Sequence, residues 1–490
     1  MNISLIDWGN DAAEHDKDLL EYFVEPSDFY RLENLKKTFI IGRKGSGKSA
    51  IRRKLQKIFN KDRVFLVETL PSQIDRKLQM INNPRAYQED TFKYMWILFL
   101  YQRALIEIAK SWKGKVALGS FEYARNYAQQ AGECDLDFVE LLAQFLYKFR
   151  IKSHNWEFNF LSGREIKNTI DEYEFHLKNI CNQEYKIIFT VDDLDLIWDN
   201  TPSSNYLLLG FLHAIQRIQS ISSGNIHVFA FLREDIYNTM MSMTQHSDKF
   251  RDIMRIQWNI NTLKTILVER IKFNNKKQGG ANLADPFREV FPPKVGTSNT
   301  MNWLFERTLC RPRELIQLCR CYTELVTTNK PDAEVLKNAE AVYSQWKLDD
   351  LCTEYSNRYP ELSKLFHYWK VYCPYSRYIL KKEEYEENFM NILADLHIEQ
   401  PWYKDLQNSI DAQSFMEILY EIGFVGDYIK PKKCGVNGHK TIYSISESSK
   451  NHNPQFDFVS IHPCFRKAME STKTKKTFKT RNHSSVAPPG

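Results

Sequence analysis

One short stretch near the start of the chain, residues 42–49, most constrains what this sequence can fold into. It fits the pattern G-x-x-x-x-G-K-[ST] at every fixed position. Three apolar residues at 39–41 precede it as a short buried strand, and apolar residues at helical spacing follow it over 50–58. The pattern therefore lies between a strand and a helix, which is the context in which such a loop cradles phosphate.

The residue types in this loop suit a nucleoside triphosphate. Glycine allows backbone conformations closed to residues with a Cβ, so successive amides can point at a phosphate, and the following helix adds the positive end of its dipole. Lys48 would reach the β- and γ-phosphates, and Ser49 Oγ would bind Mg²⁺. The predicted ATP contacts are Gly42, Arg43, Lys44, Gly45, Ser46, Gly47, Lys48 and Ser49.

A second predicted strand, residues 186–191, ends in two acids, Asp192 and Asp193. Downstream of a phosphate loop, such a pair is typical of a nucleotide hydrolase. Asp192 would hold Mg²⁺ through its water shell, and Asp193 would polarise the attacking water. The alternative is a strand exit with solvated acids, and Asp195 and Asp199 are predicted to be surface residues of that kind.

Arginines complete the candidate site. Arg233 follows the apolar strand 226–232, and ligands bind at the carboxyl ends of parallel strands, so Arg233 is either a γ-phosphate sensor or an ordinary surface arginine. Arg311 and Arg313 flank Pro312 at a helix start, from which they could swing onto a phosphate; an exposed pair of arginines is the default alternative. His227, in mid-strand, is predicted to be a satisfied core histidine.

The predicted fold class is α/β: a P-loop NTPase core with a parallel sheet, a large helical insertion, a helical lid and a C-terminal winged-helix-like domain. Within the core, 64–67 is predicted as an interior strand and 254–258 as an edge segment, while 274–300 is predicted as a linker. The winged-helix interpretation depends on an amphipathic helix and on a hairpin through Asn437-Gly438. The predicted divisions are an N-terminal helix at 1–30, the core at 31–275 with its insertion at about 71–180, the lid at 276–348, the winged-helix-like domain at 349–470 and a disordered basic tail at 471–490.

Composition limits which other classes of protein this sequence can belong to. The net charge is only +6, which permits contact with nucleic acid without demonstrating it. The nine cysteines are scattered and form no C-x-x-C pair, which favours free thiols over a zinc or redox site. The most membrane-like run, 95–101, is too short to span a bilayer, and the first nine residues lack the features of a signal peptide. We therefore expect a cytoplasmic protein with no membrane partner.

Taken together, the stretches 42–49, 187–195 and 231–235, the opening residues 9–15 and the closing residues 461–466 resemble a family of bacterial P-loop ATPases. This family is related to the STAND and origin-recognition branches of the AAA+ group. The resemblance implies the first sensor at Arg233 and the second at Arg311 or Arg313. In the wider group the water-activating residue is often Glu, and the shorter Asp193 would suit slow, switch-like hydrolysis as well as rapid turnover; we expect the slow form. Because such ATPases often sit in mobile defence islands, the resemblance also implies a role in antiviral defence.

Three hypotheses about function remain open. The first is an ATP-driven switch that controls assembly with a partner or effector, or with further copies of the chain. The second is a DNA-binding loader or initiator that holds duplex through the winged helix and the basic tail. The third, a small-molecule kinase, shares the phosphate loop but fits the acidic strand and the arginine-bearing lid less well.

Overall fold

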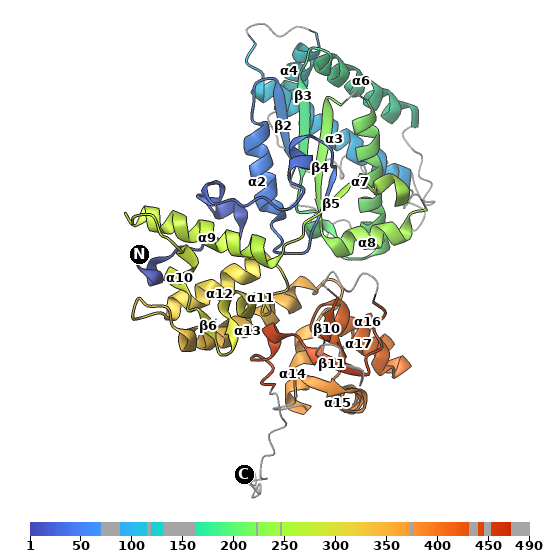
Figure 1. Cartoon of the computed structure of the whole chain (residues 1–490). Helices are drawn as coiled ribbons and strands as arrows, with labels where there is room; N and C mark the ends of the chain where they lie inside the picture. Colours follow the sequence, from blue (N-terminus) through green and yellow to red (C-terminus); the bar gives the residue numbers. More distant parts are fainter. Residues whose placement is uncertain are drawn as a thin grey trace, which may run out of the picture. The chain divides into compact units, whose positions relative to one another are not determined.

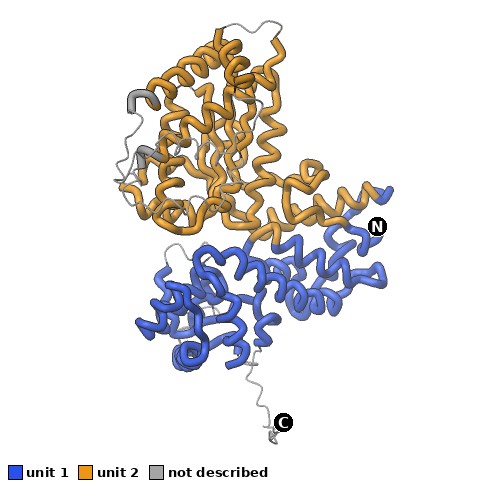
Figure 2. The backbone as a smooth tube through the Cα atoms, turned by 180° about the vertical axis from the view of Figure 1, so that it is seen from behind, with its two compact units in different colours: residues 1–6, 278–310, 314–490 blue, residues 7–277, 311–313 orange. Residues whose placement is uncertain are grey.

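The computed structural model describes residues 1–69, 89–114, 119–130, 163–221, 224–245, 247–372, 377–430, 440–444 and 452–471. The described chain divides into two compact units, which Figure 2 distinguishes by colour. The core unit consists of residues 7–277 together with Arg311–Arg313, and the second unit consists of residues 1–6, 278–310 and 314–490. The chain therefore returns to the core unit for three residues after it has left it.

The core unit is built on a parallel five-stranded sheet in the order β2-β3-β4-β1-β5. Each strand is mostly apolar, as expected for strands covered on both faces. The strands are β1 (Phe39–Ile41), β2 (Val64–Thr69), β3 (Lys186–Val191), β4 (Ile226–Leu232) and β5 (Ile253–Arg255). The α/β class and the parallel sheet predicted from the sequence are confirmed.

Helices cover both faces of this sheet (Figure 1). On one face, Ile40 and Phe231 pack against Ile51 and Leu55 of α2 (Lys48–Phe59). On the other face, Phe189 and its neighbours pack into a larger cluster with α3, α4, α6 and α7. The helices of the core unit within the described ranges are α1 (Tyr30–Glu33), α2, α3 (Glu89–Ser111), α4 (Ser120–Gln130), α6 (Gly163–Cys181), α7 (Pro202–Ser220), α8 (Glu234–Met243) and α9 (Ile260–Lys277).

The described helices of the predicted insertion, α3, α4 and α6, are thus part of the core packing. The Trp96 side chain, which is fully buried, donates from Nε1 to the Leu207 carbonyl of α7 at 2.9 Å. Tyr101 and Arg217 both bond Glu174, at 3.0 and 2.9 Å, which ties α3 and α7 to α6. Because the described helices share one hydrophobic cluster with the sheet, they stabilise the face opposite α2.

The N-terminal helix predicted for residues 1–30 is wrong. The segment forms three single 3₁₀ turns, Ile3–Leu5, Ala13–His15 and Leu19–Glu21, and the first α-helix begins only at Tyr30. Tertiary bonds override helix propensity here, because Asp16 is buried and accepts a hydrogen bond from the Tyr22 hydroxyl at 2.5 Å. The Asp16 carboxylate also lies 3.6 Å from Nη1 of Arg270 on α9.

Two strand positions and one buried histidine bear on the remaining predictions for the core. The strand predicted at 64–67 is real but lies at an edge of the described sheet, not in its interior, because no described strand pairs with β2 beyond β3. The edge position predicted for the segment near Met254 is confirmed by β5. His227 is buried, and its Nε2 lies 3.0 Å from the Lys37 carbonyl, as expected for a satisfied core histidine.

The second unit holds an antiparallel sheet in the order β10-β9-β11-β8. Its strands are β8 (Ile379–Lys381), β9 (Val425–Ile429), β10 (Lys440–Tyr443) and β11 (Phe458–Ile461). A small hairpin, β6 (Lys294–Val295) with β7 (Ser298–Asn299), turns at Gly296, whose φ is +60°. The helices are α10 (Pro286–Val290), α11 (Thr300–Phe305), α12 (Pro312–Leu325), α13 (Ala333–Glu354), α14 (Leu362–Tyr372), α15 (Lys382–Asp395), α16 (Pro401–Ser409) and α17 (Ala412–Glu421).

The second unit also differs from the sequence predictions. Residues 274–300 are not a plain linker, because they contain the end of α9, helix α10 and the β6–β7 hairpin. The lid and the winged-helix-like domain, predicted as two domains, group into one unit. The Asn437-Gly438 turn and the tail beyond Ser471 lie outside the described residues.

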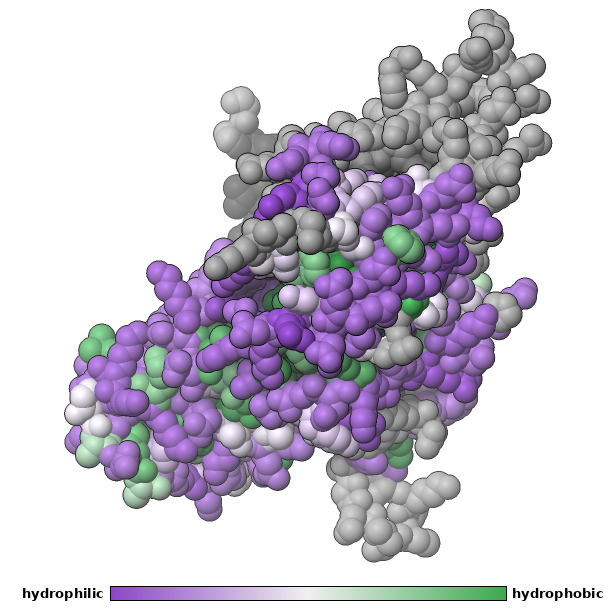
Figure 3. Space-filling model, turned by 90° about the horizontal axis from the view of Figure 1, so that it is seen from above, coloured by the Kyte–Doolittle hydropathy of each residue, from purple (hydrophilic) through white to green (hydrophobic). Residues whose placement is uncertain are grey.

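Figure 3 shows one face of the molecule, on which hydrophilic residues dominate and hydrophobic side chains show between them. Within the ranges that the structure describes, no helix is both long enough and apolar enough to cross a membrane. The cysteines in those ranges form no disulfide bond: Cys181, Cys310, Cys319, Cys321, Cys352 and Cys464.

Candidate functional site

Three strand ends bring the predicted site residues to one edge of the core sheet. Strand β1 pairs with β4 in a register that places Ile41 opposite Leu232, and the Gly42 amide donates to the Leu232 carbonyl at 3.0 Å. Strand β3 lies on the other side of β4. Because all three strands are parallel, the phosphate loop, Asp192 and Arg233 begin at the same carboxyl edge, where α/β sheets bind ligands.

Residues outside the loop between β1 and α2 hold it by donating hydrogen bonds to its carbonyl groups. The Lys44 carbonyl accepts from Arg311 Nη1 at 3.0 Å, and the Ser46 carbonyl accepts from Trp258 Nε1 at 2.9 Å. The Arg313 amide donates to the Gly45 carbonyl at 3.4 Å. Three consecutive carbonyls of the loop are therefore bonded to groups that come from other parts of the core unit.

These three hydrogen bonds, which we call the clamp of the loop, set the direction of the loop amides. In a planar trans peptide the C=O and the next N–H point in opposite directions, so the amides of Gly45 and Gly47 face away from Arg311 and Trp258. Both glycines have positive φ, +76° and +97°, which a residue with a Cβ rarely adopts. The arrangement has the form of an anion-binding nest at the start of α2.

Two glycines of the loop have no room for a side chain. A Cβ on Gly42 would come within 2.3 Å of Ser46 Oγ, and one on Gly45 within 3.0 Å of Arg313 Cβ. Ser46 is 4% exposed, and its Oγ has no hydrogen-bond partner among the described residues. A buried hydroxyl of this kind needs a partner, and a phosphate oxygen would supply one. The loop therefore fits the ligand predicted for it.

Lys48 and Asp192 lie close together, as a hydrolytic site requires. Lys48 Nζ donates to the carbonyls of Gly42 and Arg43, at 3.1 and 3.4 Å, so its ammonium folds back over the loop. Asp192 is 2% exposed. Burial raises the pKa of Asp192, while the charges of Lys48 and Arg52 and a hydrogen bond from Ser49 favour its ionised form. The predicted Mg²⁺ ligands, Ser49 and Asp192, are thus neighbours.

Arg52 is a residue of this site that the sequence predictions missed. It is 2% exposed and donates to three carboxylates from three segments of the core unit. Its Nε bonds Asp192 at 3.2 Å, its Nη2 bonds Glu14 at 2.8 Å, and its Nη1 bonds Glu68. A buried guanidinium needs such partners, because an unpaired buried charge is strongly destabilising. Arg52 thus joins the N-terminal segment to the acidic end of β3.

Asp193 takes a conformation that side chains rarely adopt, with φ at +60°. Its amide donates to Asp192 Oδ1 at 3.0 Å, which turns the chain sharply after β3. Burial, together with the charges of Asp192 and Asp195, raises the pKa of Asp193 to about 6. A carboxylate with this pKa is a better proton acceptor at neutral pH than an ordinary aspartate. Its environment therefore suits the predicted role, which remains a prediction.

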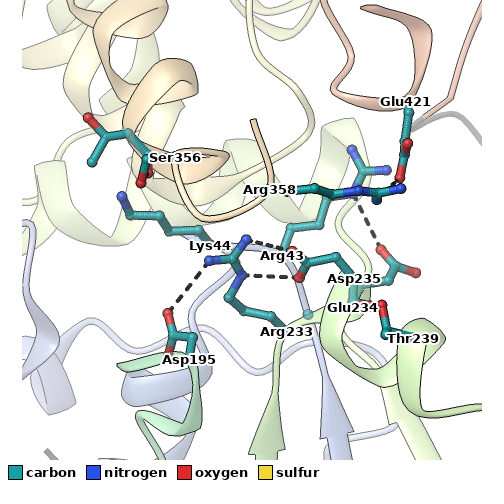
Figure 4. A network of polar contacts seen from close by, with 12 residues as sticks. Arg43, Lys44, Asp195, Arg233, Glu234, Asp235, Thr239, Ser356, Arg358 and Glu421 are labelled. Atoms are coloured by element: carbon teal, nitrogen blue, oxygen red, sulfur yellow. Dashed lines mark hydrogen bonds and ion pairs between the residues drawn. The ribbon is translucent and has the colours of Figure 1, made fainter. Parts of the chain in front are cut away.

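Arg233 is held in place rather than free at the surface (Figure 4). It is 8% exposed, donates to both carboxylate oxygens of Asp235, at 3.1 and 2.6 Å, and lies 3.9 Å from Asp195. Arg233 is therefore not the ordinary surface arginine that the sequence left as an alternative. Beside it, Glu234 pairs with Arg43 at 3.3 Å and with Arg255 at 3.6 Å. The network fixes the guanidinium beside the loop.

Arg311 and Arg313 occupy different positions relative to the loop. Arg311 is 3% exposed and donates a hydrogen bond to the Lys44 carbonyl. The alternative that both arginines are exposed is therefore wrong for Arg311. Arg313 is half-buried, and its side-chain carbons pack over Gly45. Both residues thus contact the backbone of the loop, and which of them would face a phosphate remains a prediction.

The contacts of Arg52 could have been anticipated in part. Arg52 follows Ser49 by three positions on a helix, so both side chains lie on one helical face. Trp258 gave no comparable signal, because it lies after an edge strand, far from the loop in sequence. Glu14 belongs to the opening stretch 9–15, to which no chemistry was assigned.

The chain is similar to several known proteins. Residues 261–352 match the family model of the FunZ-associated C-terminal helical domain, a stretch that runs from α9 into α13. The chain is 21% identical, over 483 residues, to a protein of Escherichia coli (strain K12) named as a transposon gamma-delta 80.3 kDa protein. That alignment covers 94% of this chain and 66% of the length of the E. coli protein. The structure of the Aeropyrum pernix ORC2 protein in ADPNP and ADP complexes is similar with a TM-score of 0.42 and 9% identity, over 93% of this chain and 96% of that one.

Proposed function

We propose that the chain binds ATP with Mg²⁺ at the loop 42–49 and hydrolyses its β–γ phosphoanhydride bond. The observation that supports this most is the convergence of Lys48, Ser49 and Asp192 at one end of the sheet, with Arg233 directly after β4, the strand between β1 and β3. The outward clamping of the loop carbonyls adds support, because it turns backbone amides toward a ligand.

In this proposal each residue has one task. The amides of the loop and Lys48 hold the β- and γ-phosphates, and Asp193 orients the attacking water and takes its proton. Arg233 faces the charge that develops on the γ-phosphate, with Asp235 fixing the guanidinium. Ser49 and Asp192 would hold Mg²⁺, which neutralises phosphate charge when bound. Arg311 keeps the loop in its binding shape.

We further propose that ATP acts as a switch. Arg311–Arg313 contact the loop, and the chain passes into the second unit directly after Arg313. A change of the loop on binding or hydrolysis would therefore act on the first turn of α12. By the resemblance to AAA+ ATPases, the output is assembly with a partner effector or with further copies of the chain, in the setting of antiviral defence and in the cytoplasm.

Equilibrium binding tests the first part of the proposal. Purified full-length chain should bind ATP with an affinity that depends on Mg²⁺, and should release phosphate slowly under single-turnover conditions. Chain that is folded by thermal melting and yet binds no ATP at millimolar concentration would refute the site.

A DNA-binding loader is the second candidate, and two observations favour it. Helix α17 is followed by the antiparallel pair β9 and β10 and then by β11, an order that supports a winged helix. The E. coli relative is named for a transposon, and by that similarity we propose DNA as the ligand of this second candidate. Binding to duplex DNA that weakens steeply with salt would favour the loader, whereas no binding at low salt would favour the switch.

A further inference from the structure

The antiparallel sheet of the second unit has one buried face and one face that is not buried. The strand pairing places four buried side chains in one row across the sheet: Ile442, Asp427, Val459 and Leu380. One residue away along each strand lies a second row, in which three side chains are half-buried and the last is exposed: Thr441, Tyr428, Phe458 and Lys381. Because side chains alternate across a strand, this second row belongs to the opposite face, which we call the open face.

Two aromatic rings lie at the centre of the open face. The rings of Tyr428 and Phe458 meet edge to face, with centroids 6.4 Å apart and an interplanar angle of 67°. Lys430, two residues beyond Tyr428, places its Nζ 3.7 Å from the centroid of the Phe458 ring. Lys430 is itself exposed. One face of the Phe458 ring is therefore covered by a flexible cation rather than by the core, and a flat ligand can take the place of the ammonium.

The charge of the open face suits a polyanion. Lys381, which is exposed, lies directly opposite Phe458 in the pairing of β8 with β11. Arg466 donates from Nη2 to Ser460 Oγ at 3.3 Å, and so adds a guanidinium farther along the same face. The described positions of this face on β8–β11 and directly after β9 include no acidic residue: Ile379, Lys381, Gly426, Tyr428, Lys430, Thr441, Tyr443, Phe458 and Ser460. The open face thus presents cations beside aromatic rings, with no carboxylate among them.

We propose that the open face binds single-stranded nucleic acid: one base stacks on Phe458 against the edge of Tyr428, and Lys430 and Lys381 contact the neighbouring phosphates. Aromatic rings that accept bases, combined with cations that follow the backbone, are the means by which proteins hold single strands. In a duplex both faces of a base are covered by its neighbours, so Phe458 selects unpaired bases. This site does not depend on the proposed ATP site, and it differs from duplex binding by the predicted winged helix.

A purely structural role for the aromatic pair makes a different prediction. Cross-strand aromatic pairs stabilise antiparallel sheets whether or not a ligand binds. In that case Phe458→Leu lowers the melting temperature and leaves the affinity for a single strand unchanged. In the proposed role the same variant weakens binding of the single strand, because leucine offers no π-face to a base.

The experiment measures the fluorescence anisotropy of a labelled oligothymidylate with the full-length chain, without ATP, at several salt concentrations. Phe458→Leu should weaken binding about tenfold with unchanged salt dependence, as expected for the loss of one stacked base. Lys430→Gln should weaken binding and reduce the slope of log affinity against log salt by about 0.7, the contribution of one phosphate contact in a single strand. Lys337→Gln, which removes an exposed lysine on α13, is the charge control and should follow the wild type.

A photo-cross-link gives a second readout that needs no variant, so it decides the question even if Phe458→Leu does not fold. An oligonucleotide that carries 5-iodouracil should cross-link to the peptide that holds Tyr428 or Phe458 in the wild type. Cross-links found only elsewhere would overturn the inference.

Three results of the anisotropy measurement would also overturn it. They are the absence of single-strand binding by the wild type, a wild-type affinity in Phe458→Leu that is folded by thermal melting, and an equal loss of affinity for a hairpin duplex in that variant. Because ATP is left out, none of these results bears on the proposed ATP site.

Discussion

Arg311 donates from Nη1 to the carbonyl of Lys44 at 3.0 Å, so a buried arginine far along the chain shapes the phosphate loop. Hydrogen bonds from charged donors are worth roughly 1.5–3 kcal/mol. Arg311→Met keeps the apolar stem and removes the donor, so ATP affinity should fall about tenfold or more. Isothermal titration would measure this. Arg320→Met, on the helix that begins directly after Arg311, is the control, and equal ATP affinity in the two variants would exclude a role for the Arg311 hydrogen bond.

Lys48→Ala should abolish measurable ATP binding, because it removes the ammonium that lies over the loop within 3.1 Å of the Gly42 carbonyl. Lys57→Ala is the matched control, since Lys57 lies on the exposed side of the same helix. A filter-binding assay with labelled ATP compares the two. ATP affinity unchanged in Lys48→Ala would refute the site.

Asp193→Asn should bind ATP normally and yet stop its hydrolysis, because the amide cannot accept the proton of the attacking water. Phosphate release in a single turnover is the readout, and Asp199→Asn serves as control for a nearby acid outside the predicted site. Full turnover in Asp193→Asn would exclude the assignment. If the variant is inactive as expected, mass analysis of what co-purifies with its ATP-loaded form should identify the partner.

The raised pKa of Asp193, about 6, predicts a pH dependence. Below this pH the carboxyl is protonated in the free protein and accepts no proton. The kcat/KM for ATP should therefore fall about tenfold per unit below pH 6 and level off above about pH 7. Measuring ATP affinity over the same pH range shows whether a fall in kcat/KM comes from weaker binding of ATP. A profile that is flat from pH 5 to 7, as roughly expected of an ordinary aspartate, would contradict this role.

Arg233→Ala should slow hydrolysis by about 10²-fold or more if Arg233 faces developing charge. Asp235→Asn should slow it less, because the guanidinium remains and loses only the charge of the carboxylate that it bonds at 3.1 and 2.6 Å. Single-turnover rates at saturating ATP separate the two. A wild-type rate in Arg233→Ala would limit this residue to a structural role in its ion-pair network.

The fold was predictable where local pattern and tertiary context agree. Strand β1, the loop and α2 follow from a strand–glycine–helix pattern whose local preferences all point the same way. The helix prediction for the N-terminal segment failed for the opposite reason. Its apolar spacing suits a helix, but the contacts of the buried Asp16 with Tyr22 and Arg270 stabilise 3₁₀ turns instead. Arg270 lies far from Asp16 in sequence, so its contact with Asp16 leaves no local signal.

The same contrast applies to the site. Lys48, Ser49, Asp192 and Asp193 carry their signal in motifs at strand ends, and the structure brings Lys48, Ser49 and Asp192 together. The contacts of Arg52, Glu14 and Trp258 depend on which segments the sheet brings side by side, and no spacing within one motif reveals that. The roles of the motif residues await the measurements above.

The bond from Trp258 Nε1 to the Ser46 carbonyl gives the molecule an optical probe of its own. Indole emission shifts with the polarity around the ring, and this ring also lies 4.0 Å from the position that a Cβ on Gly47 would take. Any rearrangement of the loop around an incoming ligand would therefore change the emission of one tryptophan. Subtracting the spectrum of Trp258→Phe would isolate that change, so loop movement could be followed without an attached dye.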